Sequence, residues 1–91
     1  MKLYEMVMKN ENFDKIKRTS KVSKNINEKA ENGWPAIMFA INNNDAKIVD
    51  LLIENGADVN FEDEDGLTPL KFARMNGNRS IVSLLLKAGA M

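Results

Sequence analysis

Cysteine and histidine are both absent from this chain of 91 residues. The lack of cysteine excludes a disulfide framework and thiol chemistry, and the lack of histidine excludes imidazole catalysis and histidine metal ligands. No apolar run approaches the roughly 18 residues of a membrane span, and the N-terminus lacks the apolar core and cleavage site of a signal peptide. These absences predict a soluble cytoplasmic protein, and no motif indicates a metal or other cofactor.

Net charge is also absent, because 13 Lys and Arg balance 13 Asp and Glu. The charges are unevenly distributed, however: residues 1–31 carry a net +3 and residues 32–91 carry a net −3. Apolar residues make up 44% of the chain, which is close to the usage of an ordinary soluble domain. The length therefore predicts one small domain, and the charge pattern predicts that its faces differ in sign.

What the chain does contain is a repeat of 33 residues. When residues 33–58 are placed over residues 66–91, 10 of the 26 positions are identical, whereas unrelated segments would share roughly two. Apart from one asparagine, the identical pairs are glycine or apolar: Gly33/Gly66, Phe39/Phe72, Ala40/Ala73, Asn43/Asn76, Ile48/Ile81, Val49/Val82, Leu51/Leu84, Leu52/Leu85, Gly56/Gly89 and Ala57/Ala90. Residues 1–32 continue the frame more faintly. This period predicts stacked copies of one supersecondary unit.

The spacing of apolar residues predicts two helices in each copy, near 2–9 and 13–21, 36–42 and 46–54, and 69–75 and 79–87. Thr68 and Pro69 are a typical helix start, with a hydroxyl at the N-cap and proline at the first helical position. The helix over 46–54 is so apolar that we expect it to be buried between its neighbours. Four methionines at helical positions are interpreted mainly as core filling: Met6, Met8, Met38 and Met75.

The residues that join one copy to the next indicate a family. Asn55-Gly56-Ala57-Asp58-Val59-Asn60, followed by Asp65-Gly66-Leu67-Thr68-Pro69-Leu70, resembles the junction between two ankyrin repeats. The resemblance implies an all-α solenoid of stacked helix-turn-helix units with β-turn fingers. It divides the single domain 1–91 into an N-terminal capping repeat (1–32), a full repeat (33–65) and a truncated C-terminal repeat (66–91). Lys71 stands where the family has histidine, so the Thr–His hydrogen bonds that tie family repeats together are not expected.

In the ankyrin family, the fingers and the exposed side of each first helix line a concave surface that binds a protein partner. Carried over by position, the resemblance implies a partner-binding surface formed by Lys9, Asn10, Lys29, Glu31, Asn32, Trp34, Asn42, Asn43, Glu62, Glu64, Asp65, Leu67, Met75 and Asn76. The predicted function is a non-catalytic protein–protein interaction module, a scaffold or adaptor. No nucleophile–base pair or phosphate-binding loop argues for an enzyme.

Two alternative functions remain open at the level of sequence. The first is a small inhibitor or immunity-type protein that occludes a basic enzyme, and the second is nucleic-acid binding through the basic N-terminal repeat. The run Glu62 to Asp65 is either a solvated finger or an acidic ridge that steers a basic partner. A calcium loop starting at Asp58 is rejected, because Asp63 and Pro69 stand where an EF-hand needs glycine and glutamate.

The basic stretch from Lys15 to Lys29 also has several interpretations. It is a solvated capping helix, a phosphate contact, or a surface that meets the acidic third repeat of another copy. The interleaved aromatic residues that grip single strands are missing from it. A salt titration would separate nucleic-acid binding from the scaffold and inhibitor functions, because phosphate binding weakens steeply with ionic strength.

Trp34 is the only tryptophan and stands at a finger position that the family leaves exposed. It is either a contact for the partner, as tryptophan often is at binding hot spots, or it packs on Met38 or a neighbouring finger. As a contact, its replacement by alanine would weaken binding by about 2 kcal/mol or more with little change in melting temperature.

The last predicted helix, 79–87, carries the apolar set of an internal copy, and only two residues follow Gly89. We therefore expect one side of Ile81, Leu84, Leu85 and Leu86 to be uncovered. Such a patch would pair with a second copy or stack on the partner.

Overall fold

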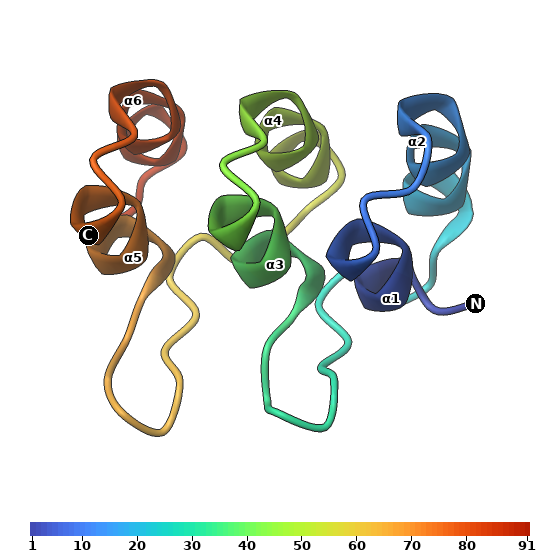
Figure 1. Ribbon diagram of the computed structural model, residues 1–91, viewed down its shortest axis with the longest axis horizontal. Helices are drawn as coiled ribbons and strands as arrows, with labels where there is room; N and C mark the ends of the chain where they lie inside the picture. The colour runs from blue at the N-terminus through green and yellow to red at the C-terminus, as the bar shows by residue number, and fades with distance from the viewer.

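The computed structural model describes residues 1–91, and it contains six α-helices arranged as three hairpins. The helices are α1 (Leu3–Met8), α2 (Phe13–Val22), α3 (Ala36–Asn42), α4 (Ala46–Glu54), α5 (Pro69–Met75) and α6 (Arg79–Lys87). Figure 1 shows the hairpins side by side, with α1, α3 and α5 in one row and α2, α4 and α6 in a second row. The expected all-α solenoid, with helices at these six places, is confirmed.

Two loops project from the first row of helices, on the side away from the second row (Figure 1). They are named here the first finger (residues 29–35) and the second finger (residues 62–68). In each finger the backbone N–H of the second residue donates to the carbonyl of the sixth, at 2.9 and 3.0 Å. Gly33 and Gly66 occupy the same place in the two turns, with φ of 85° and 78°, which residues with a Cβ rarely adopt. The fingers are therefore one backbone conformation used twice.

Side-chain caps mark where α4, α5 and α6 begin, whereas α3 follows Pro35 without one. The hydroxyl of Thr68 accepts from the N–H of Lys71 at 3.2 Å, and Pro69 is the first residue of α5. Asp45 and Asn78 cap α4 and α6 in the same way, at 3.2 and 3.0 Å. Because the last two caps recur one repeat apart, local sequence sets the turn within each hairpin.

Twenty buried apolar side chains form one core that runs through all three hairpins. The core is centred on α3, where every residue from Ala36 to Ile41 is buried, because α1 and α5 pack on its two sides and α4 also contacts it. Helix α4 lies between its neighbours α2, α3 and α6, as expected, and Ile48, Val49, Leu51 and Leu52 are buried there. Lys47, Asp50 and Glu54 are exposed along its remaining face. That face lies in the outer row, where no further layer covers it.

The first hairpin has a thinner core than the other two. In α2 only Ile16 and Ser20 are buried, whereas Phe13 and Arg18 are exposed. The buried hydroxyl of Ser20 has no hydrogen-bond partner. A repeat with one polar face agrees with the capping role predicted for residues 1–32, which remains a prediction.

Asparagine side chains join neighbouring hairpins at one repeated position. Asn27 donates to the carbonyl of Gly56 at 3.3 Å and accepts from the N–H of Asp58 at 2.8 Å. Asn60 makes the same two contacts with the residues 33 positions further on, at 3.4 and 3.0 Å. These bonds link neighbouring hairpins in a chain for which the Thr–His bonds of the family are not expected.

Candidate protein-binding surface

Three hollows lie in a row along the side of the molecule that carries the fingers, which is named here the finger side. The first hollow lies between α1 and the first finger and has a volume of about 370 Å³. The second lies between the two fingers, with about 270 Å³, and the third lies between the second finger and α5, with about 510 Å³. A segment of a partner that crosses the finger side would meet all three.

The lining of the first hollow has an apolar part, named here its floor, and two glutamates, named here its rim. The residues that line it are Tyr4, Glu5, Met8, Ala30, Glu31, Asn32 and Phe39. Its charged members are both glutamates, and the lining includes no basic side chain. The second hollow is also acidic, because the four consecutive carboxylates from Glu62 to Asp65 line it with a single basic residue, Lys29. The third mixes Asp63 and Asp65 with Lys71 and Arg74.

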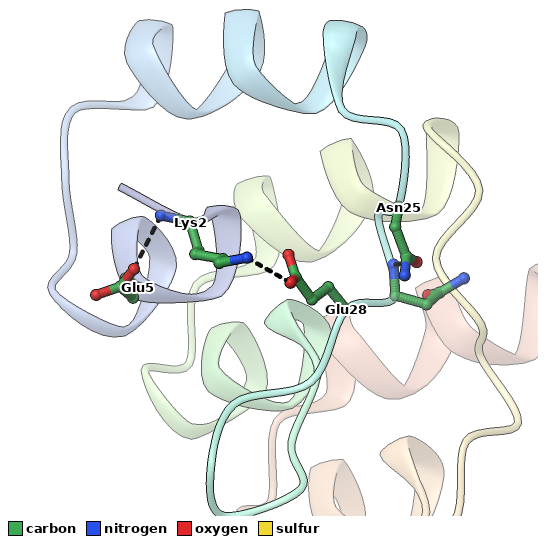
Figure 2. Close-up of polar contacts among 5 residues, drawn as sticks. Lys2, Glu5, Asn25 and Glu28 are labelled. Carbon is green, nitrogen blue, oxygen red and sulfur yellow. Dashed lines mark hydrogen bonds and ion pairs between the residues drawn. The ribbon is translucent and has the colours of Figure 1, made fainter.

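An ion pair holds α1 against the chain that enters the first finger. The Nζ of Lys2 lies 2.7 Å from Oε2 of Glu28, and the backbone N–H of Lys2 donates to Oε1 of Glu5 at 2.9 Å (Figure 2). The hydrogen bond that the Lys2 ammonium donates to Glu28 raises the pKa of Lys2 above its ordinary value. The pair is open to solvent, so it orients the two segments more than it stabilises the fold.

Trp34 belongs to the first finger and is half-buried. The centre of its indole lies 5.3 Å from the ring centre of Phe39 and 5.3 Å from that of Phe72. Its Nε1 donates to Oδ2 of Asp63 at 3.5 Å, which links the first finger to the second. These contacts agree with the packing interpretation of Trp34, with two phenylalanine rings in the place expected for Met38. Its part in partner binding remains a prediction.

Asp63 organises the second finger. Its Oδ1 accepts from the N–H of Leu67 at 2.8 Å and from the N–H of Asp65 at 2.9 Å. The hydrogen bond from Leu67, with those from Asp65 and Trp34, lowers the pKa of Asp63 below its ordinary value. Because these donors favour the charged carboxylate, the shape of the finger is coupled to the ionisation of Asp63.

The structure places most of the predicted finger residues around the hollows, whereas another group of predicted residues lines none of them. Around the hollows lie Lys29, Glu31, Asn32, Glu62, Glu64, Asp65, Leu67 and Met75. None of the hollows is lined by Trp34 or by the residues at the ends of the first helices: Lys9, Asn10, Asn42, Asn43 and Asn76. All of these side chains are exposed except Trp34 and Leu67, which are half-buried.

Two of the predicted binding residues form hydrogen bonds between neighbouring hairpins. The Nδ2 of Asn43 donates to the carbonyl of Val7 in the preceding hairpin at 3.0 Å. Asn76, the equivalent residue of the next repeat, donates to the carbonyl of Ile41 in the hairpin that precedes it, at 3.3 Å. Their amide groups therefore link neighbouring first helices, and a role in partner contact would come in addition to this.

Helix α2, which carries Lys15, Lys17, Arg18 and Lys21, belongs to the second row and lies away from the fingers (Figure 1), whereas Lys29 of the same repeat is on the first finger. Lys17, Arg18, Lys21 and Lys24 are exposed there, and only Lys15 of this stretch has an ion pair, at 3.5 Å from Glu11. The sequence predicted two faces that differ in charge. In the structure the basic face is α2, and the acidic face is the finger side.

The face of the last hairpin is less apolar than expected. We expected one side of Ile81, Leu84, Leu85 and Leu86 to be uncovered. This expectation is wrong for Ile81 and Leu85, which are fully buried, and Leu84 is half-buried. Leu86 alone of the set is exposed, by 48%. It lines a hollow of about 480 Å³ together with Val82, Ser83, Gly77 and three basic residues, Arg74, Arg79 and Lys87. Self-pairing through this face remains a prediction.

Sequence reasoning missed the apolar floor of the first hollow. Met8 was interpreted as core filling, but it is 45% exposed and lines the hollow with Tyr4. Tyr4 and Met8 are four residues apart, so they share one face of α1, and this spacing was the available signal. Nothing in the sequence placed them beside Phe39, because that contact depends on how the hairpins stack.

Two further properties concern the whole chain. No three of the Asp and Glu side chains gather in a group that could hold a metal ion. None of the helices has the length and apolar character that crossing a membrane would require.

Stacked helical hairpins with projecting turn fingers define this chain as a repeat solenoid. The family model described as "Ankyrin repeats (3 copies)" matches residues 3–91, and the chain belongs to the ankyrin repeat family. Ankyrin repeats are generally protein–protein interaction modules, and their domains are generally non-catalytic scaffolds. A search of the curated proteins found no match.

Two solved structures of ankyrin repeat domains are similar to the chain. One, from Acinetobacter baumannii AYE, has 35% sequence identity and a TM-score of 0.90, over 98% of this chain and 47% of that chain. The other, from human ASB11, has 27% identity and a TM-score of 0.86, over 100% of this chain and 41% of that chain. This chain therefore spans less than half the length of either neighbour, and the similarity confirms the stacked-hairpin fold.

Proposed function

We propose that this chain is a non-catalytic scaffold or adaptor that binds a protein partner across its finger side. The observation that supports the proposal is the row of three hollows formed by the two fingers, α1 and α5. Exposed charged side chains surround apolar ones there, which is the anatomy of a non-obligate interface. The absence of cysteine suits a reducing compartment such as the cytoplasm.

The residues proposed to contact the partner are those around the hollows. Among them are Lys29 and Glu31 on the first finger, Glu64 on the second, and Met75 at the end of α5. Met75 is 74% exposed, and an apolar side chain that stands this free is available to a partner. The asparagines at the ends of the first helices are secondary candidates, since two of them already bind the neighbouring hairpin.

The proposal is tested with two charge swaps that leave the net charge unchanged. Lys29→Glu with Glu64→Lys alters the finger side, whereas Lys47→Glu with Glu54→Lys alters the exposed face of α4. A partner captured with the intact chain is purified, and its affinity for each variant is measured by calorimetry. We expect the finger-side swap to weaken binding by about tenfold or more, which is about 1.4 kcal/mol, and the α4 swap to leave it unchanged. Equal effects of the two swaps would exclude binding on the finger side.

A second candidate function, inhibition of a basic enzyme, is favoured by the acidic lining of the first two hollows. An inhibitor would suppress the activity of the captured partner at an equal molar ratio, whereas an adaptor would leave that activity intact. Nucleic-acid binding through α2 predicts a different signature. Its affinity would fall steeply with salt and would respond to substitutions at Lys17 and Lys21 rather than on the fingers.

A further inference from the structure

We infer that the first hollow accepts an apolar side chain from a partner segment that carries basic residues beside it. The inference rests on the proposed function and names the chemistry of the occupant. It follows from two properties of the hollow, the composition of its floor and the sign of its rim. The lining residues that carry the argument are Tyr4, Met8, Ala30 and Phe39 for the floor and Glu5 and Glu31 for the rim.

The floor is built from three separate elements. Tyr4 and Met8 come from successive turns of α1, Ala30 from the first finger, and Phe39 from α3. The volume of about 370 Å³ lies within the range of small ligand sites and exceeds what one leucine or phenylalanine side chain needs. Met8 is 45% exposed, so an apolar side chain placed here would remove further apolar surface from water. Hydrophobic burial would supply the affinity.

The rim determines which partner approaches. Neither of the two ion pairs of the molecule involves Glu5 or Glu31, whereas the nearby Glu28 is already neutralised by Lys2 (Figure 2). Glu31 is exposed and accepts no side-chain hydrogen bond. A lysine or arginine beside the apolar residue of the partner would therefore find a free carboxylate, and an acidic segment would be repelled.

The second hollow extends the same preference. Its wall holds the carboxylates from Glu62 to Asp65, and its one basic residue, Lys29, is drawn over the ring of Phe61 at 5.2 Å. The third hollow differs, since Lys71 and Arg74 line it. The charge along the finger side thus changes from acidic to mixed. A bound segment would place its basic residues over the first two hollows.

The test uses fluorescein-labelled synthetic peptides and the full chain. The probe is a short peptide in which one leucine stands between two arginines. Its matched controls replace the arginines with glutamates or the leucine with glycine. The chain is tested as the unmodified protein and as Glu31→Lys and Met8→Lys, which alter the first hollow. Glu54→Lys on α4 makes the same change of charge as Glu31→Lys on an exposed site elsewhere. Circular dichroism verifies that each variant is folded.

We expect saturable binding of the arginine–leucine peptide by fluorescence anisotropy, with weaker binding of both control peptides. Glu31→Lys and Met8→Lys should each weaken it by about tenfold, and Glu54→Lys by less than about twofold. Amide chemical shifts should change at α1 and the first finger. The absence of saturable binding into the millimolar range, equal binding of the glutamate peptide, or equal loss in Glu54→Lys would each overturn the inference.

The failure of this inference can be told apart from the failure of the proposed function. A captured partner whose affinity falls with the finger-side swap, but which the arginine–leucine peptide does not displace, would leave the function standing and overturn the inference. A partner that binds equally well to the finger-side swap and to the unmodified chain would overturn the function itself.

Discussion

At the scale of single residues, asparagine side chains make several of the hydrogen bonds that join one hairpin to the next. Asn27 and Asn60 each donate to a carbonyl of the next hairpin and accept an N–H from it. Asn43 and Asn76 each donate to a carbonyl of the preceding hairpin. An amide side chain can donate and accept at once. Asn27 and Asn60 each therefore provide hydrogen-bond partners for two backbone groups at the junction between hairpins.

Replacement of Asn27 by alanine should lower the free energy of unfolding by about 1 kcal/mol or more, because two hydrogen bonds between hairpins are lost. The melting temperature measured by circular dichroism should fall by roughly 4–8 °C for each kcal/mol. Asn42→Ala is the matched control, since Asn42 is exposed and its side chain makes no hydrogen bond. If both variants melted alike, the asparagine links would not be what joins the hairpins.

Replacement of Trp34 by alanine should destabilise the fold by about 2 kcal/mol, because the indole packs on the rings of Phe39 and Phe72. This differs from the expectation of an unchanged melting temperature that follows if Trp34 is an exposed contact. Trp34→Phe keeps a ring in the same place and should recover most of the loss, as urea denaturation would show. A melting temperature unchanged in the alanine variant would restore Trp34 as a free contact residue.

At the scale of elements, the fingers are rigid because each is cross-linked at several points. The second finger is closed by its own backbone bond, by the two N–H groups that Asp63 accepts, and by the indole of Trp34 in the first finger. Helices α3 and α5 then hold the two fingers at a fixed separation. A preformed surface of this kind loses little conformational entropy when a partner binds.

The ionisation of Asp63 gives the second finger a dependence on acid. Since the pKa of Asp63 in the folded state lies below its ordinary value of 3.8, its ionised form stabilises the fold above that value, and the stabilisation is lost as the pH falls through the folded-state pKa. Asp63→Asn should therefore lower the melting temperature at neutral pH, and the difference from the unmodified chain should shrink below about pH 4.

Thermal unfolding followed at a series of pH values measures this difference. Glu62→Gln is the control, because Glu62 is an exposed neighbour whose carboxylate accepts no hydrogen bond within the finger. The difference between that variant and the unmodified chain should stay small across the series. A difference for Asp63→Asn that is constant down to the acid limit would mean that the charge of Asp63 does not hold the finger.

At the scale of the whole molecule, stability comes from stacking. The main contacts between hairpins join α1 to α3 and α3 to α5 in one row, and α2 to α4 and α4 to α6 in the other. The second hairpin is covered on both sides, and the outer two are covered on one. In such a stack each unit is stabilised by its neighbours, so damage at the centre weakens both junctions at once.

Met38 and Met75 allow this to be measured with one type of side chain. Met38, in α3, is 0% exposed, and its replacement by alanine should cost about 3 kcal/mol in the free energy of unfolding because a cavity forms in the core of the central hairpin. Met75, in α5, is 74% exposed, and the same replacement should change stability by less than about 0.5 kcal/mol. Urea denaturation followed by circular dichroism gives both values. Similar losses at the two sites would contradict a core centred on the second hairpin.

The features that depend on residues close together in the chain could be predicted from the sequence. The 33-residue period, the six helices and the finger turns at Gly33 and Gly66 all follow from apolar spacing, capping residues and glycine, and these act over a few positions. The residues of the partner-binding surface were carried over from the ankyrin resemblance, and their part in binding remains a prediction. Local hydrogen bonding and backbone geometry are sufficient reasons for these features.

The contacts between residues of different hairpins depend on how the hairpins pack, and they could not be predicted from the sequence. Trp34 could not be placed between Phe39 and Phe72 from the sequence, because its two neighbours lie in α3 and in the following repeat. The first hollow likewise needs α1, the first finger and α3 at once. Its floor and its free carboxylates result from the offset at which hairpins stack, and that offset is set by the packing of the whole core.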